Sequence, residues 1–282
     1  MKRITGFLLL CFCFIRLSAQ SMEEELPKTM NEGTLIGAGI SHVKDTYLSP
    51  FNYSGWGIRI LNERMKIIGH GKGNFSLQQI INVDISSTKN PAENVNDFGA
   101  FVDYSLGYHY QFDVSPAFRV LTGISTHLLG GFIYNTRNGN NPLSAKIDID
   151  LGISMIVLWN FRINKLPLTL RYQGELPFSG VFFSPEYGVS YYEMFNIGNL
   201  SDVVTFNSFH NKFALKNYIT VDIPIHSSIL RLGYLNSLYY SDTKNIETRI
   251  ISNSFIIGWV KEFIPLGSKR IKYKNKIRSS YY

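Results

Sequence analysis

The sequence has little cysteine and, after its first twenty residues, no long apolar run. Its only two cysteines are Cys11 and Cys13. From Ser21 onward there is therefore no thiol for a disulfide, a nucleophile or a metal ligand. The same part lacks the run of about eighteen apolar residues that a membrane-spanning helix requires. Together these absences exclude a disulfide-stabilised scaffold and a helical membrane protein.

The N-terminus has the features of a secretory signal peptide. A basic start precedes an apolar segment at 6–15, and the small or polar residues 18–20 follow it. That order predicts export with cleavage after Gln20. About ten apolar residues are too few to span a bilayer as a helix. We expect residues 1–20 to be a signal peptide and the acidic, polar segment 21–32 to be a periplasmic lead-in.

The net charge of +7 is concentrated near the C-terminus, where basic residues crowd into the end of the segment 264–282. A charge run of this kind is typical of a solvated tail. We therefore predict a basic periplasmic tail at 264–282 and no nucleic-acid partner.

Apolar and polar residues alternate strictly over two long segments. Between 98 and 112 the even positions are almost all apolar, and between 145 and 161 the odd positions are. The opposite positions hold glycine, serine and charged residues. Period-two alternation predicts β-strands with one apolar and one polar face.

The length of these strands favours a membrane barrel over a soluble sandwich. Each segment runs for about 15 residues, whereas strands of globular domains average about 5–6. A tilted strand crosses a bilayer in about 9–11 residues. We predict an all-β fold, an antiparallel transmembrane β-barrel of about ten strands over 33–263, with twelve or eight strands as alternatives. The expected strands are 33–42, 52–69, 73–86, 97–112, 117–130, 145–161, 168–176, 207–225, 229–240 and 249–263.

The predicted connections alternate between short turns and long loops. After the even strands only a few residues intervene, whereas most odd strands are followed by the longer segments 43–51, 87–96, 131–144, 177–206 and 241–248. Outer-membrane barrels place their short turns in the periplasm and their long loops outside. The pattern therefore predicts an exported protein in the outer membrane of a Gram-negative cell, with both termini in the periplasm.

Two predicted loops are candidates for binding. The segment 130–142 is rich in asparagine and glycine, which favours a folded multi-turn loop, and it presents Arg137, whose guanidinium could bind a phosphate or carboxylate. The longest loop, 177–206, is unusually aromatic. It could fold over or into the barrel mouth, or it could offer a ligand-contact surface made of Tyr187, Tyr191 and Tyr192.

These loops also carry a resemblance to a known family. The matched stretches are 47–50 with 55–57, 135–138 with 140–142, and 183–188 with 190–193. They resemble an uncharacterised family of Bacteroidetes outer-membrane β-barrel proteins, a domain of unknown function, and the likeness runs from about Gly33 to Phe263. The resemblance implies a barrel in a membrane. It implies no catalytic or binding residues.

An enzyme is the alternative to a structural or binding protein. A histidine beside a carboxylate can act as a general base, as a rim protease would require, and Ser125 and His127 have the spacing of a Ser–His pair on one strand face. The weak catalytic candidates are Ser125, His127, Asp148, Asp84 and His210. Opposite charges in a narrow lumen more simply form ion pairs, which we expect among Asp103, Arg119, Lys146, Asp148, Arg171 and Glu175.

We favour a non-enzymatic outer-membrane barrel of structural or binding type with a narrow or plugged lumen. A rim hydrolase acting on lipid or peptide is the alternative. The scattered histidines have no metal-ligand spacing, and no phosphate-cradling motif occurs, so we expect neither metal nor cofactor. The expected partners are outer-membrane lipid and the barrel-assembly machinery. The sequence does not specify a small-molecule or protein ligand.

Overall fold

The computed structural model describes residues 29–68, 74–196, 203–225 and 228–263. The expected signal peptide, most of the lead-in and the basic tail lie outside these residues. Within the described part, no helix combines the length and apolar character needed to cross a membrane. The elements are β1 (Met30–Asp45), β2 (Ser49–Ile68), β3 (Phe75–Lys89), β4 (Asn96–Ser115), β5 (Phe118–Asn135), β6 (Leu143–Ile163), β7 (Leu166–Phe183), α2 (Tyr191–Asn196), β8 (Val204–Ser208), β9 (Lys212–Ile225), β10 (Ser228–Thr243) and β11 (Ile246–Phe263).

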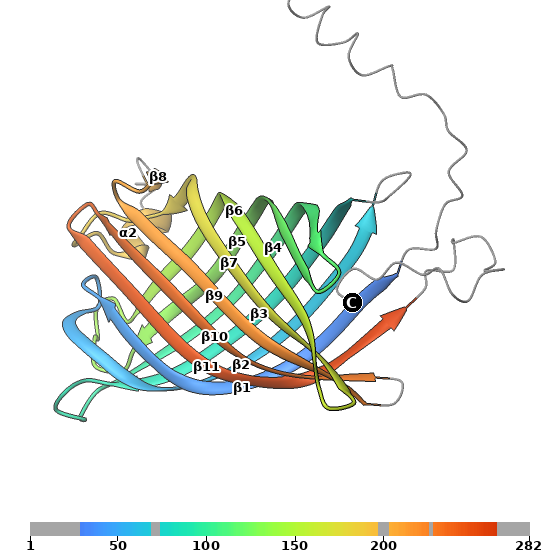
Figure 1. Ribbon diagram of the computed structural model, residues 1–282. Helices are drawn as coiled ribbons and strands as arrows, with labels where there is room; N and C mark the ends of the chain where they lie inside the picture. Colours follow the sequence, from blue (N-terminus) through green and yellow to red (C-terminus); the bar gives the residue numbers. More distant parts are fainter. Residues whose placement is uncertain (1–28, 69–73, 197–202, 226–227, 264–282) are drawn as a thin grey trace, which may run out of the picture.

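The sheet closes into a cylinder of ten antiparallel strands, as predicted (Figure 1). Neighbours along the chain pair with each other from β1 to β7 and from β9 to β11, β7 pairs with β9, and β1 pairs with β11. The short β8 pairs only with the last residues of β7. It is therefore an eleventh strand of the sheet, but the closed barrel consists of the other ten.

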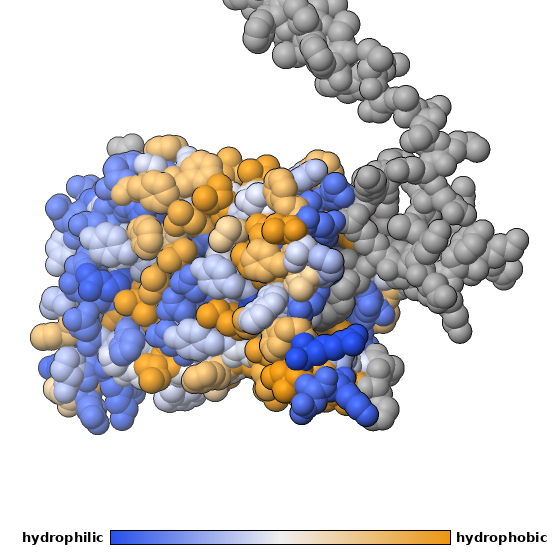
Figure 2. Space-filling model, in the orientation of Figure 1, coloured by the Kyte–Doolittle hydropathy of each residue, from blue (hydrophilic) through white to orange (hydrophobic). Residues whose placement is uncertain are grey.

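Side chains alternate between the lumen and the outer surface along each strand. On β6, Asp148, Asp150 and Ser154 are buried, whereas Leu151 and Ile153 are exposed. The outward face predicted for 145–161 is confirmed, and so is that for 98–112. Figure 2 shows hydrophobic side chains spread over the barrel wall and hydrophilic ones gathered at the end that carries α2 and β8.

The two ends of the barrel differ. We call the end where β1 begins and β11 ends the terminal end, since Met30 pairs there with Phe263. The opposite end, which carries α2 and β8, is the loop end (Figure 1). The terminal end has short turns such as 116–117 and 164–165, and the loop end has the connections 46–48, 90–95, 136–142, 184–203 and 244–245.

The predicted long loops are mostly shorter than expected, because the strands continue beyond the alternating segments. The connection expected at 241–248 is only a two-residue turn, in which Lys244 and Asn245 both have positive φ, as hairpin turns of this length require. Backbone pairing continues where hydropathy stops alternating, since the ladder satisfies backbone groups whatever the side chains. β1 likewise begins at Met30, three residues before the predicted Gly33.

Close packing of neighbouring backbones predicts different costs for two glycine substitutions. A Cβ at Gly39 would lie 1.8 Å from the backbone oxygen of Asn253, whereas a Cβ at Gly130 meets nothing within 4 Å. We expect Gly39→Ala to lower the denaturant midpoint of the folded barrel and Gly130→Ala to leave it unchanged or slightly raised. Unfolding followed by heat-modifiable gel mobility measures both. Equal midpoints for the two variants would contradict the β1–β11 register.

Candidate functional site

The loop end of the lumen is closed by a cap of aromatic and aliphatic side chains. Tyr47 and Leu48, from the turn between β1 and β2, pack in one buried cluster with side chains from five strands, and Tyr191 of α2 packs against that cluster. The rings of Tyr47 and Tyr191 meet edge to face with centroids 5.8 Å apart. Tyr191 of the aromatic loop therefore packs into the barrel mouth, as one of the two predicted roles of that loop requires.

A capping box sets the start of α2 and so the position of Tyr191. The Ser190 hydroxyl oxygen accepts a hydrogen bond from the Glu193 backbone N–H at 3.2 Å, and the Glu193 carboxylate accepts one from the Ser190 N–H at 2.7 Å. This reciprocal pair is the Ser-x-x-Glu helix start. The hydroxyl oxygen of Tyr191 then accepts a hydrogen bond from the Ala145 backbone N–H at 2.6 Å. Local sequence thus fixes the helix that carries the cap.

The two cap tyrosines stay neutral at physiological pH. Burial raises the pKa of the Tyr47 hydroxyl well above its usual value, and burial also raises the pKa of Tyr191. Tyr47 donates a hydrogen bond from its hydroxyl to the carbonyl oxygen of Val189 at 2.8 Å. An ionised phenol could not donate that bond, so this contact of the cap requires the neutral form of Tyr47.

The multi-turn loop predicted at 130–142 forms over 136–142, since residues 130–135 belong to β5. Asn135 Oδ1 accepts hydrogen bonds from the backbone N–H groups of Arg137 and Asn138, and Asn138 Oδ1 accepts them from those of Asn140 and Asn141. The Asn138 amide also donates to the carbonyl oxygen of Leu48 at 3.2 Å. This loop therefore supports the cap from outside.

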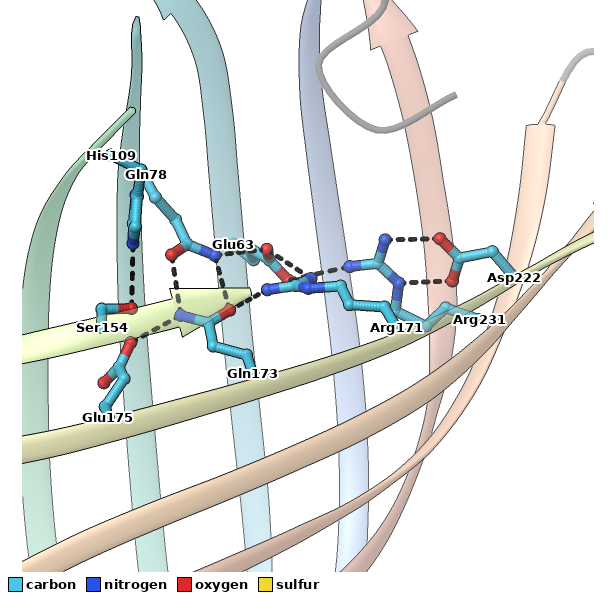
Figure 3. Close-up of polar contacts among 9 residues, drawn as sticks. All are labelled: Glu63, Gln78, His109, Ser154, Arg171, Gln173, Glu175, Asp222 and Arg231. Atoms are coloured by element: carbon cyan, nitrogen blue, oxygen red, sulfur yellow. Dashed lines mark hydrogen bonds and ion pairs between the residues drawn. The ribbon is translucent and has the colours of Figure 1, made fainter. Parts of the chain in front are cut away.

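A network of buried charges, which we call the septum, crosses the middle of the lumen (Figure 3). The Glu63 carboxylate accepts hydrogen bonds from Arg171 at 2.7 Å and from Arg231 at 2.8 Å. Arg231 also donates two hydrogen bonds to Asp222, from Nε to Oδ1 and from Nη2 to Oδ2, each 2.6 Å long. A paired fork of this kind is the strongest arginine–carboxylate geometry. The two arginines balance the charges of Glu63 and Asp222.

Glutamine side chains extend the septum across the barrel (Figure 3). Gln78 donates to Glu63 at 2.8 Å and exchanges hydrogen bonds with Gln173, which in turn donates to Glu175 at 2.7 Å. Beside them His109 bonds Ser154 at 2.9 Å. These residues come from β2, β3, β4, β6 and β7. The septum therefore ties together strands that do not pair with one another.

A chamber of about 100 Å³ lies between the septum and the cap. It contains three basic side chains, each paired with a carboxylate: Arg59 with Asp84, Lys216 with Asp103, and Lys212 with both Asp148 and Asp150 at 2.7 Å. Its apolar walls are Phe101, Leu129, Leu238 and Ile250. On the other side of the septum a larger cavity of about 650 Å³ reaches Asp222 from the terminal end.

Ser125 and His127 are adjacent, as predicted, but deep in the wall. Ser125 Oγ lies 2.9 Å from His127 Nε2, and His127 Nδ1 lies 3.7 Å from a Glu175 carboxylate oxygen. The order serine, histidine, carboxylate is that of a hydrolytic triad. However, Ser125 is only 2% exposed and does not line the chamber. The hydroxyl therefore has no space beside it in which a substrate could sit.

The other catalytic candidates lie in two separate places. Asp84 and Asp148 line the chamber together with His127. His210 lies in the exposed turn before β9, where it bonds Ser208 at 2.6 Å and stacks on Phe206. It does not line the chamber, so the structure does not assemble the predicted rim site. The sequence predicted one strand over 207–225, whereas strand β9 begins only at Lys212, so His210 lies outside it.

The binding candidates do not form one surface. Tyr191 belongs to the cap, whereas the side chains of Tyr187 and Tyr192 are exposed. Arg137 is exposed on the 136–142 loop, and only its backbone is held by Asn135. Within the described ranges no cluster of three or more histidine, cysteine or acidic side chains could hold a metal ion.

Most of the predicted lumen charges face inward, but their partners were not predicted. Lys146 pairs with Asp45 at 2.9 Å, and Arg171 pairs with Glu63. Arg119 lies opposite Asp113 near the terminal end, away from the septum. Alternation could have placed Glu63, Asp222 and Arg231 inside, since each falls on the polar face of a predicted strand. Pairing across the lumen depends on barrel shear, which one strand's sequence does not encode.

The closed cylinder, apolar outside and polar within, defines an antiparallel barrel of the kind found in outer-membrane proteins of Gram-negative bacteria. The chain belongs to a family of proteins of unknown function, DUF3316, whose model matches residues 6–270. No curated protein matches the chain.

Several solved structures share the barrel fold at very low identity. The translocator domain of autotransporter NalP from Neisseria meningitidis is 8% identical, with TM-score 0.37 over 92% of this chain and 95% of that one. Outer membrane protease OmpT from Escherichia coli is 6% identical, with TM-score 0.39 over 88% and 99%. A Pseudomonas aeruginosa FadL homologue is 8% identical, with TM-score 0.33 over 84% and 90%. These likenesses concern the fold alone.

The septum predicts that two glutamate substitutions have very different costs. Glu63→Gln leaves two buried arginines without their shared carboxylate, and breaking a buried charge network costs roughly 3–5 kcal/mol. Glu32→Gln removes only the partner of Arg64, an exposed pair 3.0 Å apart, and should cost at most about 1 kcal/mol. Urea unfolding of the reconstituted barrel measures both. A loss for Glu63→Gln no larger than for Glu32→Gln would show that the septum does not stabilise the fold.

Proposed function

We propose that this protein is an outer-membrane β-barrel with a closed lumen, which serves a structural or binding role rather than general diffusion. The observation that carries the proposal is the double closure of the lumen, by the septum at its middle and the cap at the loop end. Ten strands enclose little more space than side chains can fill. The basic side chains of the septum and of the chamber are all paired with carboxylates.

The outer surface supports a membrane location. Exposed apolar side chains such as Val102, Ile149, Leu151 and Ile153 form much of the wall. Soluble monomers rarely leave a contiguous apolar surface of this extent in water. In hydrocarbon the same surface needs no cover, and closure leaves no unpaired edge. Aromatic pairs near the terminal end, such as Tyr110 with Phe112 and Trp159 with Phe161, suit a membrane–water interface.

In this proposal the terminal end faces the periplasm and the loop end faces outward. The signal peptide at 1–20, the origin in Bacteroidetes and assembly by the barrel-assembly machinery belong to the same proposal and rest on the sequence. Outer-membrane lipid is the partner of the wall.

One observation supports the alternative of a rim hydrolase: the 2.9 Å contact between Ser125 Oγ and His127 Nε2. A nucleophile must approach its substrate within about 3 Å, and the burial of Ser125 prevents this in the closed barrel. The binding role therefore remains our proposal.

The membrane location predicts how two arginine substitutions on β6 should differ. Leu151 is 55% exposed at mid-wall and Ile163 is 57% exposed at the terminal end. Leu151→Arg should lower the free energy of unfolding in bilayers by roughly 2–4 kcal/mol, and Ile163→Arg should lower it by about 0–1 kcal/mol. Folding titrations into lipid vesicles measure both, alongside fractionation of the wild type. Wild-type protein in the detergent-free periplasmic fraction would overturn the location.

The closed lumen predicts very low conductance. Wild-type protein in planar bilayers should show no stable open-channel steps, because both the cap and the septum block the axis. The variant Tyr47→Gly with Tyr191→Gly opens only the cap and should stay closed, since the septum remains. Combining it with Arg171→Ala and Gln173→Ala should produce measurable steps. Porin-like conductance of the wild type would refute the proposal.

A further inference from the structure

The barrel wall is interrupted where β7 separates from β9. The two strands pair from Thr169 and Asp222 up to Glu175 and Lys216. Beyond that, β7 pairs with β8 instead, beginning at Ser179 and Ser208. No ladder pairing therefore joins residues 176–178 of β7 to residues 212–215 of β9. We call this interruption the wall gap.

The local sequence explains the wall gap. Pro177, which lies opposite Gly152 of β6, has no backbone N–H to donate, so it cannot contribute a donor to a ladder with β9. On its other side, the pairing of β6 with β7 shifts register between Leu151 and Gly152, which leaves Phe178 as an extra residue. The first residues of β9 stay paired with β10, from Lys212 opposite Ser241 onward. They therefore continue the ladder with β10 after the ladder with β7 has ended.

The chamber reaches the wall at this gap. Its lining includes Pro177 on the β7 side and Lys212, Ala214 and Lys216 on the β9 side. The outward neighbours of these residues, Phe178 and Phe213, are exposed, as are Phe206 and Phe209 around the preceding turn. The gap therefore has an apolar outer rim and a charged inner side.

Four carboxylates line the chamber, Asp84, Asp103, Asp148 and Asp150, but only three basic side chains do. Lys212 is shared between Asp148 and Asp150, and the remaining oxygen of each carboxylate, Oδ1, has no hydrogen-bond partner. Asn82 Oδ1, independent of these acids, also lines the chamber without a partner and is 9% exposed as a residue. Buried acceptors without donors carry a desolvation cost that a ligand donor would relieve.

We propose that the chamber binds the ammonium head of a single-chain amphiphilic amine, which enters from the membrane through the wall gap. This inference rests on the proposed membrane location. An alkylammonium offers three N–H donors and one positive charge, and the unpaired acceptors of Asp148, Asp150 and Asn82 require both. Its chain would lie between the aromatic residues of the rim. An anion would meet surplus carboxylates, and Ca²⁺ requires six to eight oxygens, more than the unpaired set provides.

Binding is tested with the full chain in phosphatidylcholine nanodiscs. Octylammonium chloride is the probe, 1-octanol and octyl sulfate are its neutral and anionic counterparts, and empty nanodiscs correct for partitioning. Calorimetry should show saturable binding of octylammonium alone. Asp150→Asn should weaken it roughly 10- to 100-fold. Asp242→Asn, the same change at an exposed position on β10, should leave it unchanged.

The route of entry has its own variants. Ala214→Trp narrows the wall gap and should slow octylammonium association in stopped-flow measurements. Ala38→Trp, an outward position on β1 across the barrel, should not slow it. If Asp150→Asn fails to fold, Asn82→Leu replaces it and should also weaken binding.

Three results would overturn the inference: equal binding of octanol and octylammonium, displacement of octylammonium by Ca²⁺ or K⁺, or unchanged affinity in Asp150→Asn. A protein that folds into nanodiscs, conducts no current and binds no amine would refute the inference alone. A protein that does not enter the membrane would refute the proposed function instead.

Discussion

The pairing of β1 with β11 is the constraint on which the rest of the structure depends. All 16 residues of β1 have partners on β11, from Met30 opposite Phe263 to Asp45 opposite Thr248. A sheet that closes in this way has no edge, so its backbone groups are satisfied without water. Closure also divides every strand into an inner and an outer face. Hydrophobic residues can then cover the outside, and polar residues must find partners within.

That second requirement explains why the lumen is filled rather than open. A buried charge without a partner is costly, whereas a well-oriented fork such as Arg231 with Asp222 offsets much of its desolvation. Each basic side chain of the septum contacts at least one carboxylate, Gln78 also bonds Glu63, and Gln173 also bonds Arg171. Apolar layers lie on both sides, with Leu61 and Ile80 toward the chamber and Met65 with Leu121 toward the terminal end. Polar and apolar layers thus alternate along the axis of the lumen.

Alternation predicted which residues face inward but not which of them meet. Period two is a local property, so the outward Leu151 and the inward Asp150 could be assigned from β6 alone. The Ser125–His127 contact is also local, since it joins residues two apart on one strand. By contrast, Glu63 meets Arg171 across 108 positions of sequence, and that meeting depends on how all ten strands tilt. The capping box at Ser190 and Glu193 was available in the sequence as Ser-x-x-Glu.

The wall gap is the exception to the continuous backbone pairing of the closed barrel. In a barrel whose ladders otherwise continue around the circumference, a proline at 177 in a strand paired on both sides is unfavourable unless the ladder is already interrupted there. Unpaired backbone groups in a membrane are tolerated only where they line a cavity or contact protein. The chamber meets this condition, because it reaches the wall at Pro177 and Ala214. The surplus acceptors of Asp148 and Asp150 lie on β6, the other neighbour of β7. The break in the ladder and the uncompensated carboxylates therefore occur at one place: the gap offers an apolar path to an alkyl chain, and the carboxylates offer acceptors to its ammonium head.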